Sequence, residues 1–341
     1  MSHATIVGTG SWGTTLAILV ARKHLEATLL TRAEPEATTL QAERQNSRFV
    51  PGFPFPNTLT VSASTSESLA NARVVILVVP AQRLRENCRW LVPHLAPDSI
   101  VVSATKGLEL DTGKCMSEVL REELPERFHN SICVLSGPNL AMEILQDKPS
   151  SSVVASSNKQ AAREVQDLLT QPKFRVYTSE DVTGVEFGGA LKNIVAIGAG
   201  VCDGLGLGNN TKAAFLTRGL AEITRLAVAA GGHPQTLAGL AGMGDLIATS
   251  YSGLSRNHHV GEQLAQGKSL ADIRSDMKNV AEGIDTAAAT MRLAETMGVD
   301  MPITRATFDV MFRGMPLRQV ISDLLLRAPA PEWDEPTTKK T

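Results

Sequence analysis

The chain has 341 residues, of which 43% are hydrophobic and 20% are charged, and its formal net charge at pH 7 is −2. A chain of this length is long for one hydrophobic core, so we expect two domains. The nearly balanced charge argues against a nucleic-acid partner and against a membrane-surface protein. An anionic substrate would therefore be held by a few local cations.

The sequence shows neither the pattern of a targeting signal nor the spacing of paired cysteines. The N-terminus reaches a strand-like run by Thr5 without the basic and hydrophobic regions of a signal peptide. The hydrophobic runs are too short to insert in a membrane. The four cysteines are far apart and show no metal-ligand spacing. These features predict a soluble, cytoplasmic protein with reduced cysteines and no metal site.

The first motif lies between a strand and a helix. The β-type run Ala4–Val7 leads into Gly8-Thr9-Gly10-Ser11-Trp12-Gly13, and a helical pattern follows. In Gly-x-Gly-x-x-Gly the glycines permit the turn, the approach of a pyrophosphate and the packing of helix on strand. The helix N-terminus adds free N–H groups. The motif predicts a dinucleotide site; a glycine-rich turn in another α/β domain is the alternative.

The next strand-like run, Ala27–Thr31, ends before Arg32. At this point an acidic residue pairs with the ribose hydroxyls of NAD, whereas an arginine pairs with the 2′-phosphate of NADP or stacks on adenine. Because Glu34 is close by, the position favours NADP and leaves NAD open.

Further strands are predicted at 74–79, 99–105, 131–135, 153–155 and 174–177, with an ordered loop at 46–56. Lys106 follows the run at 99–105, and Ser136-Gly137-Pro138-Asn139 follows the run at 131–135. Open α/β sheets bind ligands beyond the carboxyl ends of their strands, so we expect a substrate there. A solvated loop lysine is the alternative for Lys106. The pattern predicts a doubly wound α/β domain over residues 1–180.

From residue 181 helical patterns predict an all-α domain over 181–328, and residues 329–341 read as a mobile tail. In the stretch 186–200, Gly188, Lys192, Ala196 and Gly200 share one helical face. Each glycine costs a helix about 1 kcal/mol relative to alanine, so another segment must pack closely. Lys192 is then either a general base whose pKa burial lowers, or a lysine that reaches the helix edge.

Three polar segments follow this helix. The glycine-rich segment 203–211 is predicted to be a turn that ends in helix-capping residues. Gly242-Met243-Gly244-Asp245 presents one carboxylate. Ser255-Arg256-Asn257 precedes a helical pattern, where an arginine beside neutral donors suits a phosphate group. A surface ion pair is the alternative for Arg256, and the adjacent His258 and His259 are expected to be structural.

Taken together, these motifs make the chain resemble the bacterial NAD(P)-dependent glycerol-3-phosphate dehydrogenases from end to end. The resemblance implies a Rossmann-type N-terminal domain, an all-α C-terminal domain and an active site in the cleft between them. It also implies a cytoplasmic homodimer that supplies glycerol 3-phosphate for phospholipid synthesis. The motifs that carry it are Gly8–Thr14, Lys106–Leu108, Ser136–Pro138, Leu191–Asn193, Asp203–Gly206, Asn210-Thr211, Thr217–Gly219, Gly242–Leu246, Ser255–Asn257 and Glu282-Gly283.

The resemblance also implies residue roles. Lys192 corresponds to the proton acceptor, with Lys106 and Asp245 as its catalytic partners. The implied cofactor contacts, for NADP or NAD, are Gly8, Gly10, Ser11, Trp12, Gly13, Arg32, Lys106, Ala141, Arg256, Val280 and Glu282. The implied substrate contacts are Lys106, Gly137, Asn139, Lys192, Asp245, Ser255, Arg256 and Asn257. Asn139 departs from the family, which usually has Ser or Thr there.

The implied reaction interconverts sn-glycerol 3-phosphate and dihydroxyacetone phosphate by hydride transfer with NAD(P)(H). A related 6-phosphogluconate or 3-hydroxyacid dehydrogenase would share the first domain and the lysine. The Ser255–Asn257 cluster and the turn before Asp245 argue against that alternative. A non-catalytic dinucleotide-sensing module would need the glycine turn but neither Lys106 nor Lys192.

Overall fold

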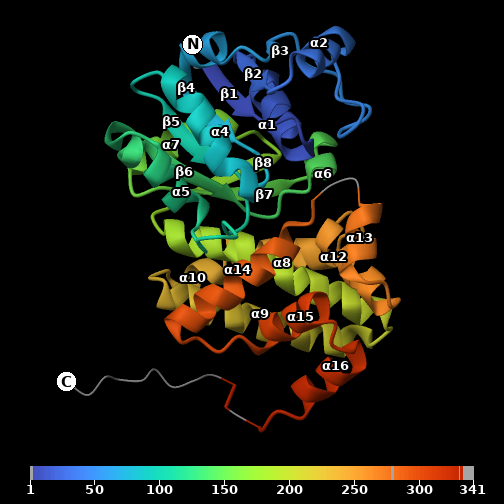
Figure 1. Ribbon diagram of the computed structural model, residues 1–341. Helices are drawn as coiled ribbons and strands as arrows, with labels where there is room; N and C mark the ends of the chain where they lie inside the picture. Colours follow the sequence, from blue (N-terminus) through green and yellow to red (C-terminus); the bar gives the residue numbers. More distant parts are fainter. Residues whose placement is uncertain (1–2, 278–279, 330, 333–341) are drawn as a thin grey trace, which may run out of the picture.

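The computed structural model describes residues 3–277, 280–329 and 331–332. Figure 1 shows a sheet flanked by helices, formed by the N-terminal part of the chain, beside a second body made of helices. Of the tail predicted at 329–341, position 330 and positions 333–341 lie outside the described residues.

One sheet organises the first body. Its strand order is β3-β2-β1-β4-β5-β6-β7-β8; β3 through β6 are parallel, β7 is antiparallel to β6, and β8 is parallel to β7. The order reverses between β1 and β4, which is where doubly wound sheets bind ligands. The predicted Rossmann-type fold is confirmed. The strands are β1 (His3–Val7), β2 (Ala27–Leu30), β3 (Leu59–Ser62), β4 (Ala72–Leu77), β5 (Ile100–Ser103), β6 (Ile132–Ser136), β7 (Ser150–Ala155) and β8 (Phe174–Ser179).

Helices cover both faces of this sheet because neighbouring strand residues point to opposite sides. Ile76 packs into the core with α1 and α7, whereas Val75 and Leu77 pack with α4 and α5. The helices are α1 (Ser11–Arg22), α2 (Glu34–Glu43), α3 (Thr65–Leu69), α4 (Leu84–Leu91), α5 (Met116–Glu123), α6 (Ala141–Leu145) and α7 (Lys159–Leu169), with short 3-10 turns η1 (Ala81–Arg83), η2 (Val92–His94) and η3 (Glu126–Ser131).

The strand β3 was not among the predicted strands. It has four residues, of which only Leu59 and Val61 are buried, and it lies at the edge of the sheet. Two buried residues give too short an alternation to stand out from the proline-rich segment before them.

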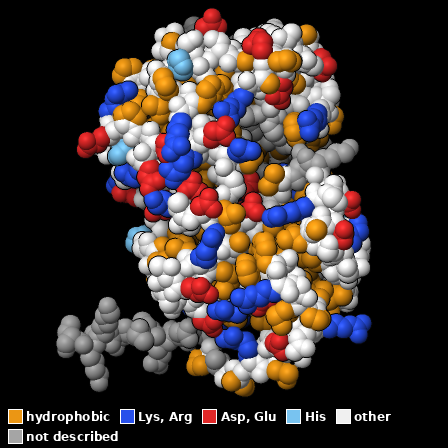
Figure 2. Space-filling model, viewed as in Figure 1, with side chains coloured by type: hydrophobic (Ala, Val, Ile, Leu, Met, Phe, Trp, Pro, Cys, Tyr) orange, Lys and Arg blue, Asp and Glu red, His pale blue; other side chains and the backbone are white. Residues whose placement is uncertain are grey.

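The second body is helical, as predicted. Its elements are α8 (Val182–Gly204), α9 (Gly208–Ala229), α10 (Pro234–Leu237), the π-helical turn η4 (Leu240–Gly244), α11 (Asp245–Tyr251), α12 (Arg256–Ala265), α13 (Leu270–Asp276), α14 (Glu282–Met297), α15 (Pro302–Phe312) and α16 (Leu317–Leu325). Figure 2 shows hydrophobic side chains gathered on this half, where a groove of about 1170 Å³ opens between α8, α9, α15 and α16.

The predicted capping turn at 203–211 is wrong in its extent. The helix α8 continues to Gly204, and α9 already begins at Gly208. Gly206 and Gly208 adopt φ of 64° and 81°, so the chain reverses within three residues. Asn210 and Thr211 consequently lie inside α9.

The central helix α8 is long and apolar enough to cross a membrane, but its apolar stretch is completely buried inside the protein. Its glycines allow neighbouring backbone to touch it. A Cβ at Gly200 would lie 1.9 Å from the carbonyl oxygen of His258 on α12, and one at Gly188 would lie 2.7 Å from the carbonyl oxygen of Ala241. These contacts provide the close approach that the glycine-rich face predicted.

Adding one methyl group tests this contact. In an open helix, Gly→Ala stabilises by about 1 kcal/mol. We expect Gly200→Ala to lower the free energy of unfolding by about 1–3 kcal/mol instead, because the methyl group meets the backbone of α12. Urea denaturation measures the change. Gly253→Ala is the control, since no described atom lies within 4 Å of its added Cβ. A stabilised Gly200→Ala protein would contradict the packing.

Candidate active site

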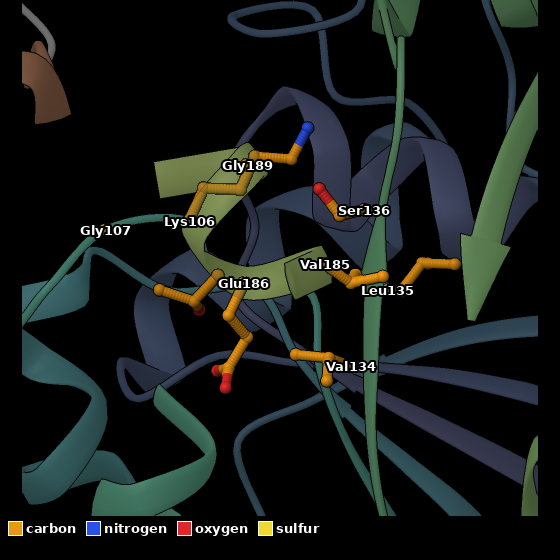
Figure 3. Close-up of a pocket in the computed structure, with 9 residues that line it drawn as sticks. Lys106, Gly107, Val134, Leu135, Ser136, Val185, Glu186 and Gly189 are labelled. Carbon is orange, nitrogen blue, oxygen red and sulfur yellow. The ribbon is translucent and has the colours of Figure 1, made fainter. Parts of the chain in front are cut away.

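The carboxyl ends of β5 and β6 meet the central helix of the second domain. Lys106 follows β5, and Ser136 ends β6; Figure 3 shows both beside Gly189 of α8. A Cβ at Gly189 would lie 2.4 Å from Ser136 Oγ, so any side chain there would displace the hydroxyl of Ser136. The glycine thus lets α8 reach the ligand-binding edge.

Asp245, the first residue of α11, joins two lysines. Lys192 Nζ lies 2.8 Å from Asp245 Oδ1, and Lys106 Nζ lies 2.6 Å from Asp245 Oδ2. Lys106 also donates to the carbonyl oxygen of Gly137 at 2.9 Å. Lys192 and Asp245 are only 6% and 2% exposed. The structure therefore brings together the three predicted catalytic residues from three separate segments.

Thr249 belongs to the same network, although it was not among the predicted residues. Lys192 donates to its hydroxyl, which in turn lies 3.3 Å from Asp245 Oδ1. The signal in the sequence is its spacing, since residues i and i+4 share a helical face. A threonine at that spacing is too common to indicate chemistry without the lysine beside it.

Burial and charge set the protonation of this network. Burial lowers the pKa of Lys192 to about 8, with the charge of Asp245 opposing this shift and that of Lys106 adding to it. Burial alone would raise the pKa of Asp245, but the two lysines outweigh it and hold that pKa below its usual value. At neutral pH Asp245 is ionised, and the pKa of Lys192 lies close to the pH.

The glycine turn after β1 fits a pyrophosphate. A Cβ at Gly8 would lie 2.3 Å from the carbonyl oxygen of Val78, and one at Gly13 would lie 2.0 Å from that of Gly8. Above Gly10 there is open space, with no described atom within 4 Å of an added Cβ. In the described part of the chain no side chain caps α1, so its first N–H groups face that space. The cradle therefore suits a dinucleotide.

The other predicted cofactor residues come from separate segments of the chain. Arg32 follows β2, where it pairs with Glu86 on α4 and not with the lysine network. Ala141 begins α6, and Val280 is 48% exposed just before α14. Trp12, in the first turn of α1, packs edge to face on Phe174.

Glu282, the first residue of α14, lies beside the turn after β5. Its Oε2 would be 3.5 Å from a Cβ at Gly107. Burial raises the pKa of Glu282 to about 7, and the nearby charge of Arg256 opposes this shift. Arg256, Glu282 and the Lys106-Gly107 turn are thus neighbours.

Two of the predicted substrate contacts are engaged in holding α12. Ser255 caps this helix by accepting from the backbone N–H of His258 at 3.2 Å. Asn257 donates to Asn193 Oδ1 at 2.9 Å and accepts from the backbone N–H of Gly283 at 3.0 Å. Of the Ser255–Asn257 cluster, Arg256 is the exposed member.

Asn139 presents an acceptor with no partner among the described residues. Its Nδ2 lies 3.2 Å from Ser152 Oγ, which itself donates to the carbonyl oxygen of Ser136. Its Oδ1 is buried and unpaired, as are Ser136 Oγ and Trp12 Nε1. In native proteins such atoms are completed by ordered water or by a bound molecule, and Asn139 and Ser136 lie where a substrate is expected.

Comparison with known proteins covers nearly the whole chain. Residues 3–162 match the family model described as NAD-dependent glycerol-3-phosphate dehydrogenase N-terminus, and residues 181–322 match the C-terminus model of the same family.

Two relatives are named glycerol-3-phosphate dehydrogenase [NAD(P)+]. One, from Dehalococcoides mccartyi, is 48% identical over 92% of this chain and 87% of its own length. Another, from Geobacter metallireducens, is 48% identical over 96% of this chain and 98% of its own length. The crystal structure of glycerol-3-phosphate dehydrogenase from Coxiella burnetii superposes with a TM-score of 0.90 at 34% identity, covering 96% of this chain and 99% of that one.

Proposed function

The chain belongs to the NAD-dependent glycerol-3-phosphate dehydrogenase family, and we propose that its interdomain site interconverts sn-glycerol 3-phosphate and dihydroxyacetone phosphate. The enzyme is an oxidoreductase that uses NAD or NADP. The observation that carries the proposal is the buried Lys192–Asp245–Lys106 network at the ligand-binding edge of the sheet. Membership of this family argues against a non-catalytic sensor and against a 3-hydroxyacid substrate.

Lys192 is the proton donor and acceptor in this proposal. The bound dinucleotide supplies or receives the hydride at C2 of the substrate. An ammonium group has three donors. Among the described residues Asp245 and Thr249 accept two of them, which leaves the third for the C2 oxygen. A pKa near 8 suits this role, because the group gives and takes a proton readily near neutral pH.

Lys106 and Asp245 assist the proton transfer by Lys192. Asp245 fixes the Nζ atoms of both lysines and stabilises the ammonium form of Lys192. The charge of Lys106 stabilises the oxyanion that develops at C2, in a site where little water screens it. Gly137 holds Lys106 through its carbonyl oxygen.

Arg256 is the proposed phosphate ligand. It begins α12, whose N-terminus adds partial positive charge. Ser255 caps that terminus, and Asn257 fixes it against α8 and α14. Phosphate bound there would hold C2 in place for reaction. The unpaired Asn139 Oδ1 would accept a substrate hydroxyl. The Gly8–Gly13 turn, with Arg32, Ala141, Val280 and Glu282, would bind the cofactor.

We also propose that the domains divide near residue 180 and that the protein is a cytoplasmic homodimer supplying glycerol 3-phosphate for phospholipid synthesis. Support for a dimer comes from the helical half. Met243, Ile247 and Tyr251 recur every four residues and are 42%, 47% and 56% exposed. Such a stripe suits an interface with a second copy. Light scattering should give twice the mass of the chain; a monomer at micromolar concentration would contradict the proposal.

Removing the lysine tests the chemistry. Lys192→Met should lower kcat for reduction of dihydroxyacetone phosphate by about 10²–10⁴-fold, because no proton is then delivered. Initial rates of NAD(P)H oxidation measure this. Lys212→Met is a matched control, since Lys212 is also buried and its Nζ lies 2.6 Å from Asp203. A Lys192→Met enzyme with more than about a tenth of the wild-type rate would rule out the role.

The pH dependence gives a second test. Burial lowers the pKa of Lys192 from 10.5 to about 8, so the lysine loses its proton above that pH. Reduction needs the protonated form and should slow as the pH rises through about 8, whereas oxidation should accelerate. Profiles of kcat/KM in both directions measure this. Asp245→Asn should move both inflections to lower pH, because the charge of Asp245 raises the pKa of Lys192. Identical profiles in both directions would contradict the assignment.

A further inference from the structure

The adenosine end of the dinucleotide site carries an ion pair that no role assigned above explains. Arg32 follows β2, at the edge where an acidic residue would contact the ribose of NAD and an arginine the 2′-phosphate of NADP. Its Nη1 lies 2.5 Å from Glu86 Oε1, and its guanidinium lies 5.3 Å from the centre of the Trp90 ring. Arg32, the cation that would bind the 2′-phosphate, thus already has an anionic partner.

The pair joins two segments that follow the strands on either side of β1. Glu86 and Trp90 lie on α4, which follows β4, and Arg32 follows β2. Because β1 lies between β2 and β4, the pair connects the segments on either side of the strand that leads to Gly8. Arg32 and Glu86 are nearly half exposed, at 46% and 48% of their side chains, so an incoming phosphate can reach them.

Glu86 is ionised at neutral pH. The hydrogen bond and charge of Arg32, followed by those of Arg83, hold the pKa of Glu86 below its usual value. Arg83 Nη1 lies 3.1 Å from Glu86 Oε2. Glu86 thus lies between two arginines, the type of side chain that would otherwise pair with a 2′-phosphate.

A second carboxylate lies at the same end. Glu36 on α2 accepts hydrogen bonds from the hydroxyl of Thr9, inside the glycine turn, and from the hydroxyl of Thr31, next to Arg32. A carboxylate at this point accepts from ribose hydroxyls and repels a phosphate. The two carboxylates therefore offset the preference for NADP that Arg32 predicts from the sequence alone.

We propose that Glu86 is a specificity-determining residue: it holds Arg32 in an ion pair that the 2′-phosphate of NADP(H) must displace, whereas NAD(H) leaves the pair intact. The proposal rests on the proposed function only in requiring that a dinucleotide binds at the Gly8–Gly13 turn. In this chain Glu86 weakens NADP(H) binding and keeps NAD(H) competitive. Trp90 keeps the guanidinium in place when the carboxylate is exchanged.

The test measures binding, so that it does not depend on turnover. Dissociation constants for NADPH and NADH are taken from nicotinamide fluorescence, for the full chain and for Glu86→Gln. We expect NADPH to bind about three- to tenfold more tightly to the variant, since a partly exposed ion pair no longer competes with the phosphate. The NADH constant should change by less than about twofold, since that cofactor has no 2′-phosphate.

A double-mutant cycle asks whether Glu86 acts through Arg32. Arg32→Gln should weaken NADPH binding, and adding Glu86→Gln to it should produce no further gain. Glu164→Gln is the control, since it breaks a two-point ion pair with Arg73 at the opposite end of β4. It should alter neither constant.

Three results would overturn the proposal. They are unchanged or weaker NADPH binding in Glu86→Gln, an equal gain in the Arg32→Gln background, and a gain of the same size in Glu164→Gln. Failure of the proposed reaction would appear separately, as NADH binding without turnover of dihydroxyacetone phosphate.

Discussion

Backbone contact along α8 determines where the reactive lysine can lie. At three of its glycines a different segment touches this helix: Ala241 at Gly188, Ser136 at Gly189 and His258 at Gly200. Each glycine costs a helix about 1 kcal/mol relative to alanine, and the packing offsets that cost. The same contacts bring the end of β6, the segment before Asp245 and the start of α12 to one helix. Lys192 lies about one turn after Gly189 and is therefore where the functional segments converge.

The charges buried at that point depend on one another. Asp245 lies between two ammonium groups. Without it, the buried Lys192 would be an uncompensated charge, and Lys106 would lose its carboxylate partner. Burial of Lys192 costs folding free energy, and the same burial lowers its pKa toward the pH at which it must exchange a proton. Because Lys106 comes from the sheet and Lys192 from the helical domain, the network also fixes the two domains against each other. Chemistry and domain packing are thus carried by the same hydrogen bonds.

Local patterns predicted what is local in the chain. The glycine turn, the buried strands and the apolar surroundings of Lys192 were readable because strand, turn and helix periods lie within a few residues. The hydrogen-bond partners of the site residues could not be predicted in this way. Glu86 lies 54 residues from Arg32, and the bond from Asn257 to Asn193 spans 64, so neither has a local signature. The strand β3 was not predicted for a different reason, since its two buried residues make too short an alternation of buried and exposed positions.

The two ends of the dinucleotide site obey different electrostatics, and this separates specificity from catalysis. At the reacting end Lys192 and Asp245 are buried, so little water screens their charges, and losing one leaves the other unpaired. At the adenosine end, Arg32 and Glu86 are half exposed, so water and salt weaken their attraction and either can exchange partners at small cost. A change of charge at the exposed end therefore alters which cofactor binds without disturbing the pKa of Lys192.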